Sequence, residues 1–285
     1  MGRRRSRPQR RVGRKPDRLV NLLTAALLGV VQGLTEFLPV SSTAHLLLAE
    51  RFLGFDDPGG VFTVMIQLGA ILAVVWLYRE KVWSVVTGLP HSPEARNFAL
   101  LVVAGVVPAL VAGALFSSYV KQVLYYSPVV IGTAFVVGGA IMLVVEGRRP
   151  LASVREVDAI PLRSAFGVGC CQVLALVPGV SRSGATIVGG MAMGLERTTA
   201  AEFSFFLSMP TMSAAFAHDF LEVRHVLSAD RALEISIGFV MAFLAALVVV
   251  RPFLRFVGRS GFAPFAWYRI VAGTALLAAA GAGWL

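Results

Sequence analysis

The sequence predicts an all-α polytopic membrane protein built as an inverted-topology repeat, each half holding one re-entrant helix hairpin and three transmembrane helices. Three observations predict this fold: an apolar composition, six long apolar runs, and two polar breaks of similar sequence about 140 residues apart. Hydrophobic residues make up 56% of the 285 positions and charged residues 15%, with a mean hydropathy of +0.75. This composition excludes a soluble domain of this length.

The net charge of +10 is concentrated at the N-terminus. Residues 1–18 hold nine basic residues and one acidic residue, Asp17, and so contribute +8 of it. Because the stretch has no apolar period, we expect a disordered basic tail that could bind anionic lipid headgroups at about 1 kcal/mol per basic residue. Translation that starts after Met1 is the alternative. Only membrane segments follow the tail, so we expect no nucleic-acid partner.

Six apolar runs approach the length needed to cross a hydrocarbon core of about 30 Å, which takes about 20 helical residues. Charged or turn residues bound these runs, such as Arg79-Glu80-Lys81 after the first. The predicted spans are 62–78, 97–117, 128–146, 202–220, 235–251 and 266–284. Pro108 and Pro210 fall inside two of them, where we expect local kinks.

Two further regions, 19–53 and 160–195, are apolar but interrupted near the middle by proline and hydroxyl residues. Half of such a region, about 15 helical residues, rises only about 22 Å and cannot span a bilayer. We therefore expect re-entrant hairpins, which bilayers tolerate where protein or water satisfies the break. One kinked span with an interfacial helix is the alternative.

The two interrupted regions resemble each other at an offset of 140 residues. Matched pairs are Gly29 and Gly169, Gln32 and Gln172, Val40 and Val180, and Ser41 and Ser181. Three spans lie between the regions and three follow the second. Because three is odd, the second unit enters from the opposite face, which predicts an inverted repeat with halves at 19–150 and 151–285.

The hydroxyl residues at the two breaks indicate an anion site. Ser41, Ser42 and Thr43 precede one apolar helix, and Ser181, Arg182 and Ser183 precede the other. Hydroxyl residues in this position are N-cap signals, and a helix N-terminus offers free N–H groups to an anion. In an inverted repeat the two helix starts face each other. Arg182 adds a forked cation suited to phosphate oxygens, and at membrane depth it needs Glu36 or a ligand as its partner.

An acid, hydroxyls, an imidazole and an arginine at one buried anion site indicate phosphoryl chemistry. Glu36 lies four residues after Gln32, on the same helix face, and His45 lies beyond the break, where a hairpin folds it back. His45 or Glu36 would move a proton, and a serine hydroxyl or a water would attack. The alternative is a structural Glu36–Arg182 pair beside a structural histidine.

These segments resemble the signature motifs of the undecaprenyl-diphosphatase family of the bacitracin-resistance type. The first family motif, Glu/Gln-x-x-x-Glu followed by Pro-x-Ser-Ser-x-x-His, corresponds to 32–36 and 39–45. The second, Pro-Gly-x-Ser-Arg-Ser-Gly-x-Thr, corresponds to 178–186, and the similarity covers nearly the whole chain after about residue 19. The resemblance implies hydrolysis of undecaprenyl diphosphate to undecaprenyl phosphate and phosphate, which recycles the lipid carrier of cell-wall synthesis and confers bacitracin resistance.

The resemblance also implies the site. Its catalytic positions are Glu36, Ser42, His45 and Arg182, and its substrate-binding positions are Gln32, Ser41, Ser181, Ser183 and Thr186. A divalent cation is expected. Because Gln32 stands at the first acidic position of the motif, we expect Mg²⁺ or Ca²⁺ held mainly by Glu36, diphosphate oxygens and water. The nucleophile is either Ser42 or a water activated by His45.

The remaining expectations concern location and partners. We expect a multi-pass protein of the bacterial plasma (inner) membrane that acts on a polyprenyl diphosphate lipid. The positive-inside rule favours an active site open to the outer (periplasmic) face, because the outer loops then hold only Lys121, Arg224 and Arg231. The basic tail favours the reverse. Small-residue runs at 132–139 and 189–190 are compatible with a homo-oligomer. The alternative function is a secondary transporter or flippase of a polyprenyl phosphate.

Overall fold

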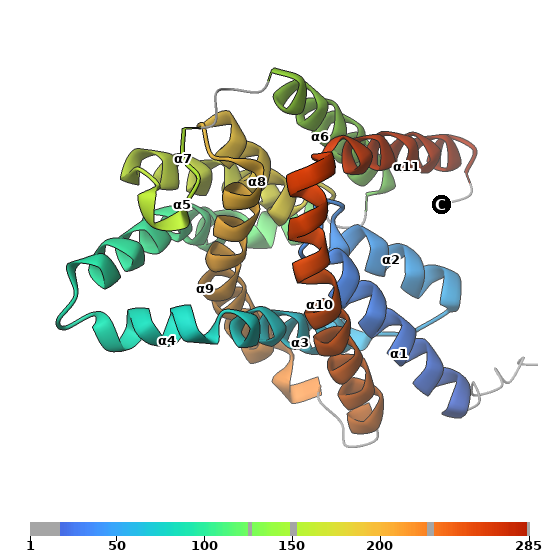
Figure 1. The fold of residues 1–285 in the computed structure, drawn as a ribbon. Helices are drawn as coiled ribbons and strands as arrows, with labels where there is room; N and C mark the ends of the chain where they lie inside the picture. Colours follow the sequence, from blue (N-terminus) through green and yellow to red (C-terminus); the bar gives the residue numbers. More distant parts are fainter. Residues whose placement is uncertain (1–17, 125–126, 149–152, 227–230, 284–285) are drawn as a thin grey trace, which may run out of the picture.

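The computed structural model describes residues 18–124, 127–148, 153–226 and 231–283, and these ranges are almost entirely helical (Figure 1). Apart from Arg18, the predicted basic tail lies outside the described residues. The α-helices are α1 (Arg18–Thr35), α2 (Ser42–Leu53), α3 (Val61–Leu77), α4 (Arg79–Gly88), α5 (Pro93–Val123), α6 (Pro128–Arg148), α7 (Leu162–Val173), α8 (Arg182–Ala192), α9 (Arg197–Val223), α10 (Ala232–Ser260) and α11 (Ala263–Gly281). Short 3-10 turns lie at Pro58–Gly60, Val157–Ala159, Leu174–Leu176 and Arg224–Val226.

Five helices in the described ranges are long and apolar enough to cross a membrane. They are Pro58–Leu77, Pro93–Ser117, Pro128–Arg148, Ala232–Ser260 and Ala263–Gly281. The prediction of a polytopic helical membrane protein is therefore confirmed in its general form. The sixth predicted span, 202–220, lies within α9, which has 27 residues but is not among the five. The N-terminal half of α9 packs against protein and buries Thr199, Ser204 and Ser208, whereas much of its C-terminal half, from Pro210 on, is exposed.

Two helices extend well past the spans predicted for them. α10 continues through Pro252 to Ser260, although the predicted span ended at 251, and α5 runs over 93–123 rather than 97–117. The sequence pattern marks only the apolar part of each helix. Beyond that part α10 carries Arg255 and Arg259 on exposed positions, where water can solvate them.

Each interrupted region folds as two short helices with a break between them. α2 has 12 residues and α8 has 11, so each rises less than about 20 Å and is too short to span. Within the described chain, the non-glycine residues with positive φ are Ser41 (66°) and Ser181 (73°), which match at the offset of 140. Such a conformation is unfavourable for an L-residue and persists only where its surroundings hold it.

The largest buried cluster centres on α9 and positions the first break. Phe203, Phe205 and Leu207 of α9 are fully buried. Phe37, which directly follows Glu36, packs edge-on against Phe205, with ring centroids 5.5 Å apart. This contact fixes the loop between α1 and α2 against the central helix, and therefore fixes Glu36.

Glycines allow the short helices to approach the long ones closely. A Cβ added at Gly169 of α7 would lie 2.6 Å from the carbonyl oxygen of Gly105 in α5. Gly29 of α1, the residue matched to Gly169, meets the backbone of Gly238 in α10 in the same way. Gly132, Gly138 and Gly139 of α6 meet α11, so these small residues serve contacts within the chain. Self-association stays a prediction.

Candidate active site

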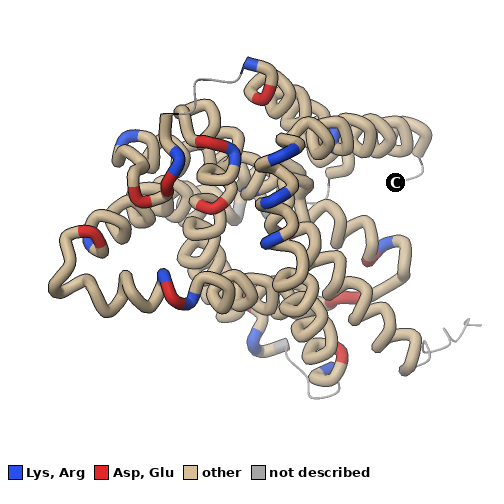
Figure 2. Tube along the Cα trace, in the orientation of Figure 1, with Lys and Arg blue, Asp and Glu red and all other residues tan. Residues whose placement is uncertain are grey.

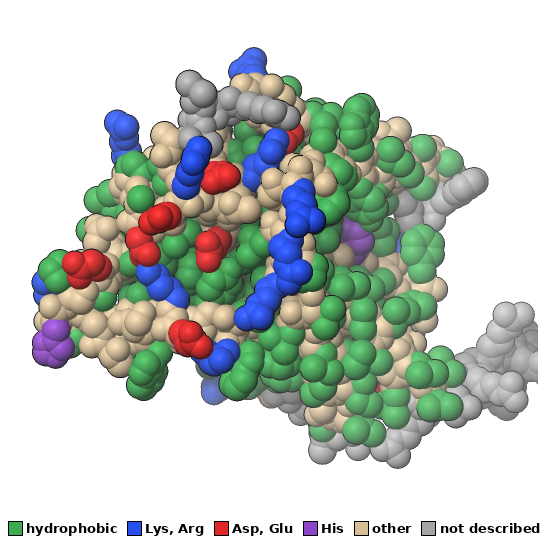
Figure 3. Space-filling view, in the orientation of Figure 1, with side chains coloured by type: hydrophobic (Ala, Val, Ile, Leu, Met, Phe, Trp, Pro, Cys, Tyr) green, Lys and Arg blue, Asp and Glu red, His purple; other side chains and the backbone are tan. Residues whose placement is uncertain are grey.

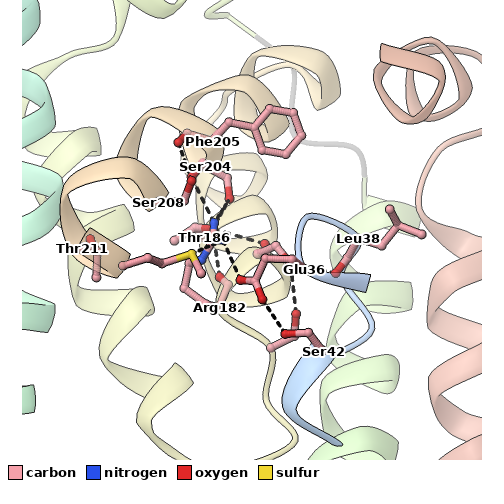
Figure 4. A network of polar contacts seen from close by, with 12 residues as sticks. Glu36, Leu38, Ser42, Arg182, Thr186, Ser204, Phe205, Ser208 and Thr211 are labelled. Carbon is pink, nitrogen blue, oxygen red and sulfur yellow. Dashed lines mark hydrogen bonds and ion pairs between the residues drawn. The ribbon is translucent and has the colours of Figure 1, made fainter. Parts of the chain in front are cut away.

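Glu36 is the centre of a polar network that joins the two breaks (Figure 4). Its Oε2 accepts hydrogen bonds from the Ser42 hydroxyl at 2.6 Å and from Gln32 Nε2 at 2.8 Å. Its Oε1 accepts one from Arg182 Nη2 at 3.2 Å. The Glu36 side chain is only 6% exposed, and Arg182 lies 146 residues further along the chain. The predicted meeting of the two motifs at one site therefore occurs.

Arg182 begins α8 and links the first break to α9. Besides Glu36, its guanidinium donates through Nη1 to the backbone oxygen of Ser204 at 3.2 Å. Its Nε is buried and has no hydrogen-bond partner among the described residues. Glu36 is thus the counter-ion that a buried arginine requires. A guanidinium held by its Nη atoms in this way is fixed in orientation, as recognition of a phosphate needs.

The two helix starts are capped differently. Ser181 Oγ accepts a hydrogen bond from the Gly184 N–H at 3.1 Å, so the predicted N-cap of α8 is confirmed. Ser41 makes no side-chain cap on α2, so the same prediction for α2 is wrong. Ser42, one residue later, donates its hydroxyl to Glu36 rather than accepting from the helix start. The first N–H groups of α2 therefore have no side-chain acceptor from the cap residue.

His45 does not join the network around Glu36. Its Nδ1 is 2.8 Å from the carbonyl oxygen of Ser41, which can only accept, so Nδ1 carries the proton. Its Nε2 then accepts from the Tyr268 hydroxyl at 2.5 Å, and the two rings stack with centroids 5.7 Å apart. Both nitrogens of a neutral imidazole are thereby used. His45 therefore contacts the left-handed Ser41 and Tyr268 of α11 rather than Glu36.

A cavity of about 440 Å³ opens beside this network. Of the predicted site residues, its walls include Glu36, Ser41, Ser42, Ser181 and Arg182. The walls continue along α5 through Ala109, Gly113 and Ser117, and along α9 through Thr211, Ala215, His218 and Asp219. The wall is thus polar beside the network and again at His218 and Asp219, and small and apolar side chains lie between them, a lining suited to a polar headgroup with an apolar chain.

The other predicted residues lie outside the cavity wall and hold its elements together by hydrogen bonds. Ser183 Oγ donates to the Leu38 carbonyl at 2.8 Å and so ties α8 to the first break. Thr186 Oγ1 lies 2.7 Å from Ser204 Oγ on α9. Gln32 orients Glu36, and none of these three residues, nor His45, is part of the cavity wall.

Sequence reasoning missed several polar residues at the site. Gln67 and Thr211 line the cavity, Tyr268 of α11 contacts His45, and Arg269 of α11 contacts both breaks. A signal for them existed, since polar and charged side chains inside an apolar span are costly and indicate function. Arg269 inside the predicted span 266–284 is the plainest instance.

The fold and the site together define a class: a multi-pass helical membrane protein with a buried glutamate that is bonded to an arginine and a serine beside a cavity. Comparison with known proteins then places the chain within that class. Residues 25–275 match the family described as Bacitracin resistance protein BacA.

Curated relatives agree with this match. The undecaprenyl-diphosphatase of Paracoccus denitrificans is 48% identical over 264 residues, covering 93% of this chain and 99% of the relative. The undecaprenyl-diphosphatase of Cereibacter sphaeroides strain ATCC 17029 is 50% identical, covering 92% and 98%. Undecaprenyl-diphosphatase 2 of Paramagnetospirillum magneticum is 52% identical, covering 89% and 97%. The chain therefore belongs to the bacitracin-resistance (BacA) family, and the resemblance seen in its motifs is confirmed.

Proposed function

We propose that this protein hydrolyses undecaprenyl diphosphate to undecaprenyl phosphate and inorganic phosphate. The relatives that share about half of its residues carry the name of this activity. The observation in the chain itself is the Ser42 hydroxyl bonded to the Glu36 carboxylate at 2.6 Å, beside Arg182. The product is the lipid carrier of cell-wall synthesis, and bacitracin resistance fits the family.

The geometry favours Ser42 as the nucleophile. Glu36 accepts the Ser42 proton while Ser42 Oγ attacks the terminal phosphorus, and the bond from that phosphorus to the bridging oxygen breaks to release undecaprenyl phosphate. A water then attacks the phosphoserine and returns the serine with release of phosphate. Arg182 and the N-terminus of α8 stabilise the charge on the phosphoryl oxygens. His45 acts on this reaction only through Ser41.

Acid quenching during turnover tests this assignment. We expect mass spectrometry of the quenched enzyme to find phosphate on Ser42, and Ser42→Ala to abolish both the adduct and turnover. Steady turnover with unmodified Ser42, including in rapid-quench samples, would instead assign the attack to a water held by Ser42 and Glu36.

We infer that a divalent cation also binds at Glu36. A carboxylate has about four acceptor positions, and three are used here by Ser42, Gln32 and Arg182. Gln32 Oε1 is buried beside it without a hydrogen-bond partner in the described part of the chain. Carboxylate and amide oxygens suit Mg²⁺ and Ca²⁺, and Gln32 would join Glu36 as a ligand once its amide turns over, since its Nε2 now donates to Glu36. When bound, the ion would neutralise charge on the diphosphate.

An inverted repeat with re-entrant hairpins is the architecture that best supports this site. In such a repeat each contact between helices should recur between the corresponding helices of the two halves. Accordingly, α1 packs on α10 as α7 packs on α5, and α3 packs on α10 as α9 packs on α5. Each short hairpin therefore packs on a long helix of the other half. The matched left-handed serines at positions 41 and 181 support the same relation.

We further propose that the cavity opens to the periplasmic face of the inner membrane. Basic residues lie along the C-terminal half of α10, where Arg251, Arg255 and Arg259 are exposed, and both basic and acidic residues occur on this face (Figures 2 and 3). The positive-inside rule makes that face cytoplasmic. The cavity wall runs along α9 away from that face, to His218 and Asp219 near the C-terminus of this helix.

Transport of a polyprenyl phosphate is the second candidate, favoured by the exchanged helix contacts, because inverted repeats with broken helices are common in transporters. Liposomes that carry a labelled polyprenyl phosphate and the purified protein separate the two functions. Hydrolysis alone requires no movement of the label across the bilayer, whereas movement without phosphate release would support transport.

A further inference from the structure

Arg269 of α11 is a buried charge to which the proposed reaction assigns no role. The residue is only 1% exposed. Its Nη1 donates to the carbonyl oxygen of Pro39 at 3.2 Å, and its Nη2 donates to that of Gly179 at 2.9 Å and to that of Ala134 at 3.0 Å. Pro39 and Gly179 are matched positions of the two breaks, 140 residues apart. A single guanidinium therefore holds both breaks, each two residues before its left-handed serine.

The charge of Arg269 has no carboxylate partner among the described residues. Its contacts are backbone carbonyls and the Phe135 ring, whose centroid lies 5.1 Å from the guanidinium carbon, and its buried Nε has no hydrogen-bond partner in the described part of the chain. Arg182, in contrast, is paired with Glu36. The two arginines and the one carboxylate thus leave the buried site with an excess positive charge, which is costly at membrane depth unless an anion balances it.

The surrounding helices leave space for this side chain and direct it towards the anion site. A Cβ at Gly138 of α6 would collide with Arg269 Nη2, so a larger residue there would force the guanidinium to move. On the other side, a Cβ at Gly184 would lie 3.4 Å from Arg269 Nη1. Gly184 belongs to the first turn of α8, and its N–H is the one that Ser181 caps. The charge therefore lies against the helix N-terminus at which a phosphate would bind.

We propose that Arg269 is a positioning residue of the diphosphate site. Its fork holds the two breaks at a fixed separation, and the bound diphosphate, rather than a protein carboxylate, balances its charge. The proposal rests on the proposed function, since it requires an anionic substrate at the two helix starts. Arg269 thereby has two separate roles. Its positive charge serves binding of the diphosphate, and its two Nη groups, by holding the breaks in place, serve turnover.

Two substitutions separate these properties in the purified protein. Arg269→Lys keeps the charge and loses the fork, and Arg269→Gln loses the charge. The matched control is Arg255→Gln, which removes an exposed positive charge of α10. Binding is measured by calorimetry with methylenediphosphonate, a diphosphate that is not hydrolysed at its bridge, and kcat and KM are measured with a short polyprenyl diphosphate.

We expect Arg269→Gln to weaken methylenediphosphonate binding by about tenfold or more, the effect of losing one close charge interaction. Arg269→Lys should bind the probe nearly as well as wild type but lower kcat. Arg255→Gln should change neither. Wild-type affinity in Arg269→Gln would overturn the proposal. If that variant does not fold, as judged by size-exclusion chromatography, the lysine variant decides, and an unchanged kcat in it would overturn the proposal.

The same measurements distinguish a failure of the proposed function from a failure of the role proposed for Arg269. Failure of the wild-type protein to release phosphate would contradict the proposed function. Phosphate release by wild type, with a glutamine variant that binds the probe normally, would contradict only the role of Arg269.

Discussion

Replacing Glu36 by glutamine tests the network at the site with almost no change of shape. Glu36 bonds to the Ser42 hydroxyl, to Gln32 and to Arg182, and its side chain is 6% exposed. The substitution removes the base for Ser42, and loss of a positioned base costs about 10²–10⁴-fold in turnover. This range corresponds to about 3–5 kcal/mol in the activation free energy.

The same substitution should also lower stability. It leaves the Arg182 guanidinium, which is 13% exposed, without its counter-ion. Breaking a buried pair by removing one partner costs about 3–5 kcal/mol, and we expect the lower end because a glutamine oxygen still accepts from Arg182. Thermal unfolding in detergent, compared at one protein concentration, measures this loss alongside turnover.

Glu146→Gln is the matched control. Glu146 pairs with Arg197 and is 11% exposed, but neither residue belongs to the cavity wall. The control should also lower the unfolding temperature while turnover stays close to wild type. Our reasoning is refuted if Glu36→Gln keeps more than a tenth of wild-type turnover at saturating substrate, or if Glu146→Gln loses turnover equally.

Three further predictions follow from the cation site, from one titrating group and from one helix contact. Gln32→Glu should lower the Mg²⁺ concentration needed for half-maximal activity. EDTA should lower the unfolding temperature of this variant, because two adjacent carboxylates repel each other without an ion. The same unfolding temperature with Mg²⁺ and with EDTA would contradict this. Burial raises the pKa of Glu50 from its ordinary 4.5 to about 7, outside the five spans, so its protonated form is favoured by folding. Its contribution to stability is full below about pH 4.5 and is lost as the pH rises through about 7; Glu50→Gln should flatten this part of the profile of unfolding temperature against pH. Gly169→Ala places a Cβ 2.6 Å from the Gly105 carbonyl oxygen and should cost about 1–3 kcal/mol. Gly147→Ala, whose Cβ meets no described residue within 4 Å, should not destabilise, and equal unfolding temperatures of the two variants would contradict the close contact of α7 with α5.

The sequence predicted those parts of the molecule that depend on local pattern. Apolar length located the five spans, and the two polar interruptions located the short helices α1, α2, α7 and α8. The motif residues Glu36, Ser42 and Arg182 were correctly expected at one site, because an arginine at membrane depth needs a buried partner.

The pattern could not predict contacts that depend on packing between distant helices. His45 was expected beside Glu36, but Tyr268 of α11 holds its ring elsewhere, and no spacing along the chain reveals that contact. The cap on α2 failed because the Ser42 hydroxyl bonds to Glu36 and Ser41 has a left-handed backbone. Arg269 was overlooked although a charge inside an apolar span is itself a signal, and the pattern could not predict its contacts because its partners are backbone carbonyls.

The central claim is that Ser42 and Glu36 of the first break and Arg182 of the second act on one diphosphate. Phosphate release from undecaprenyl diphosphate by the purified protein, compared among wild type, Ser42→Ala and Arg182→Ala, tests it most directly. We predict release by wild type and a loss of at least about 10²-fold in each variant, with both variants still folded. Undiminished release by either folded variant would contradict the claim.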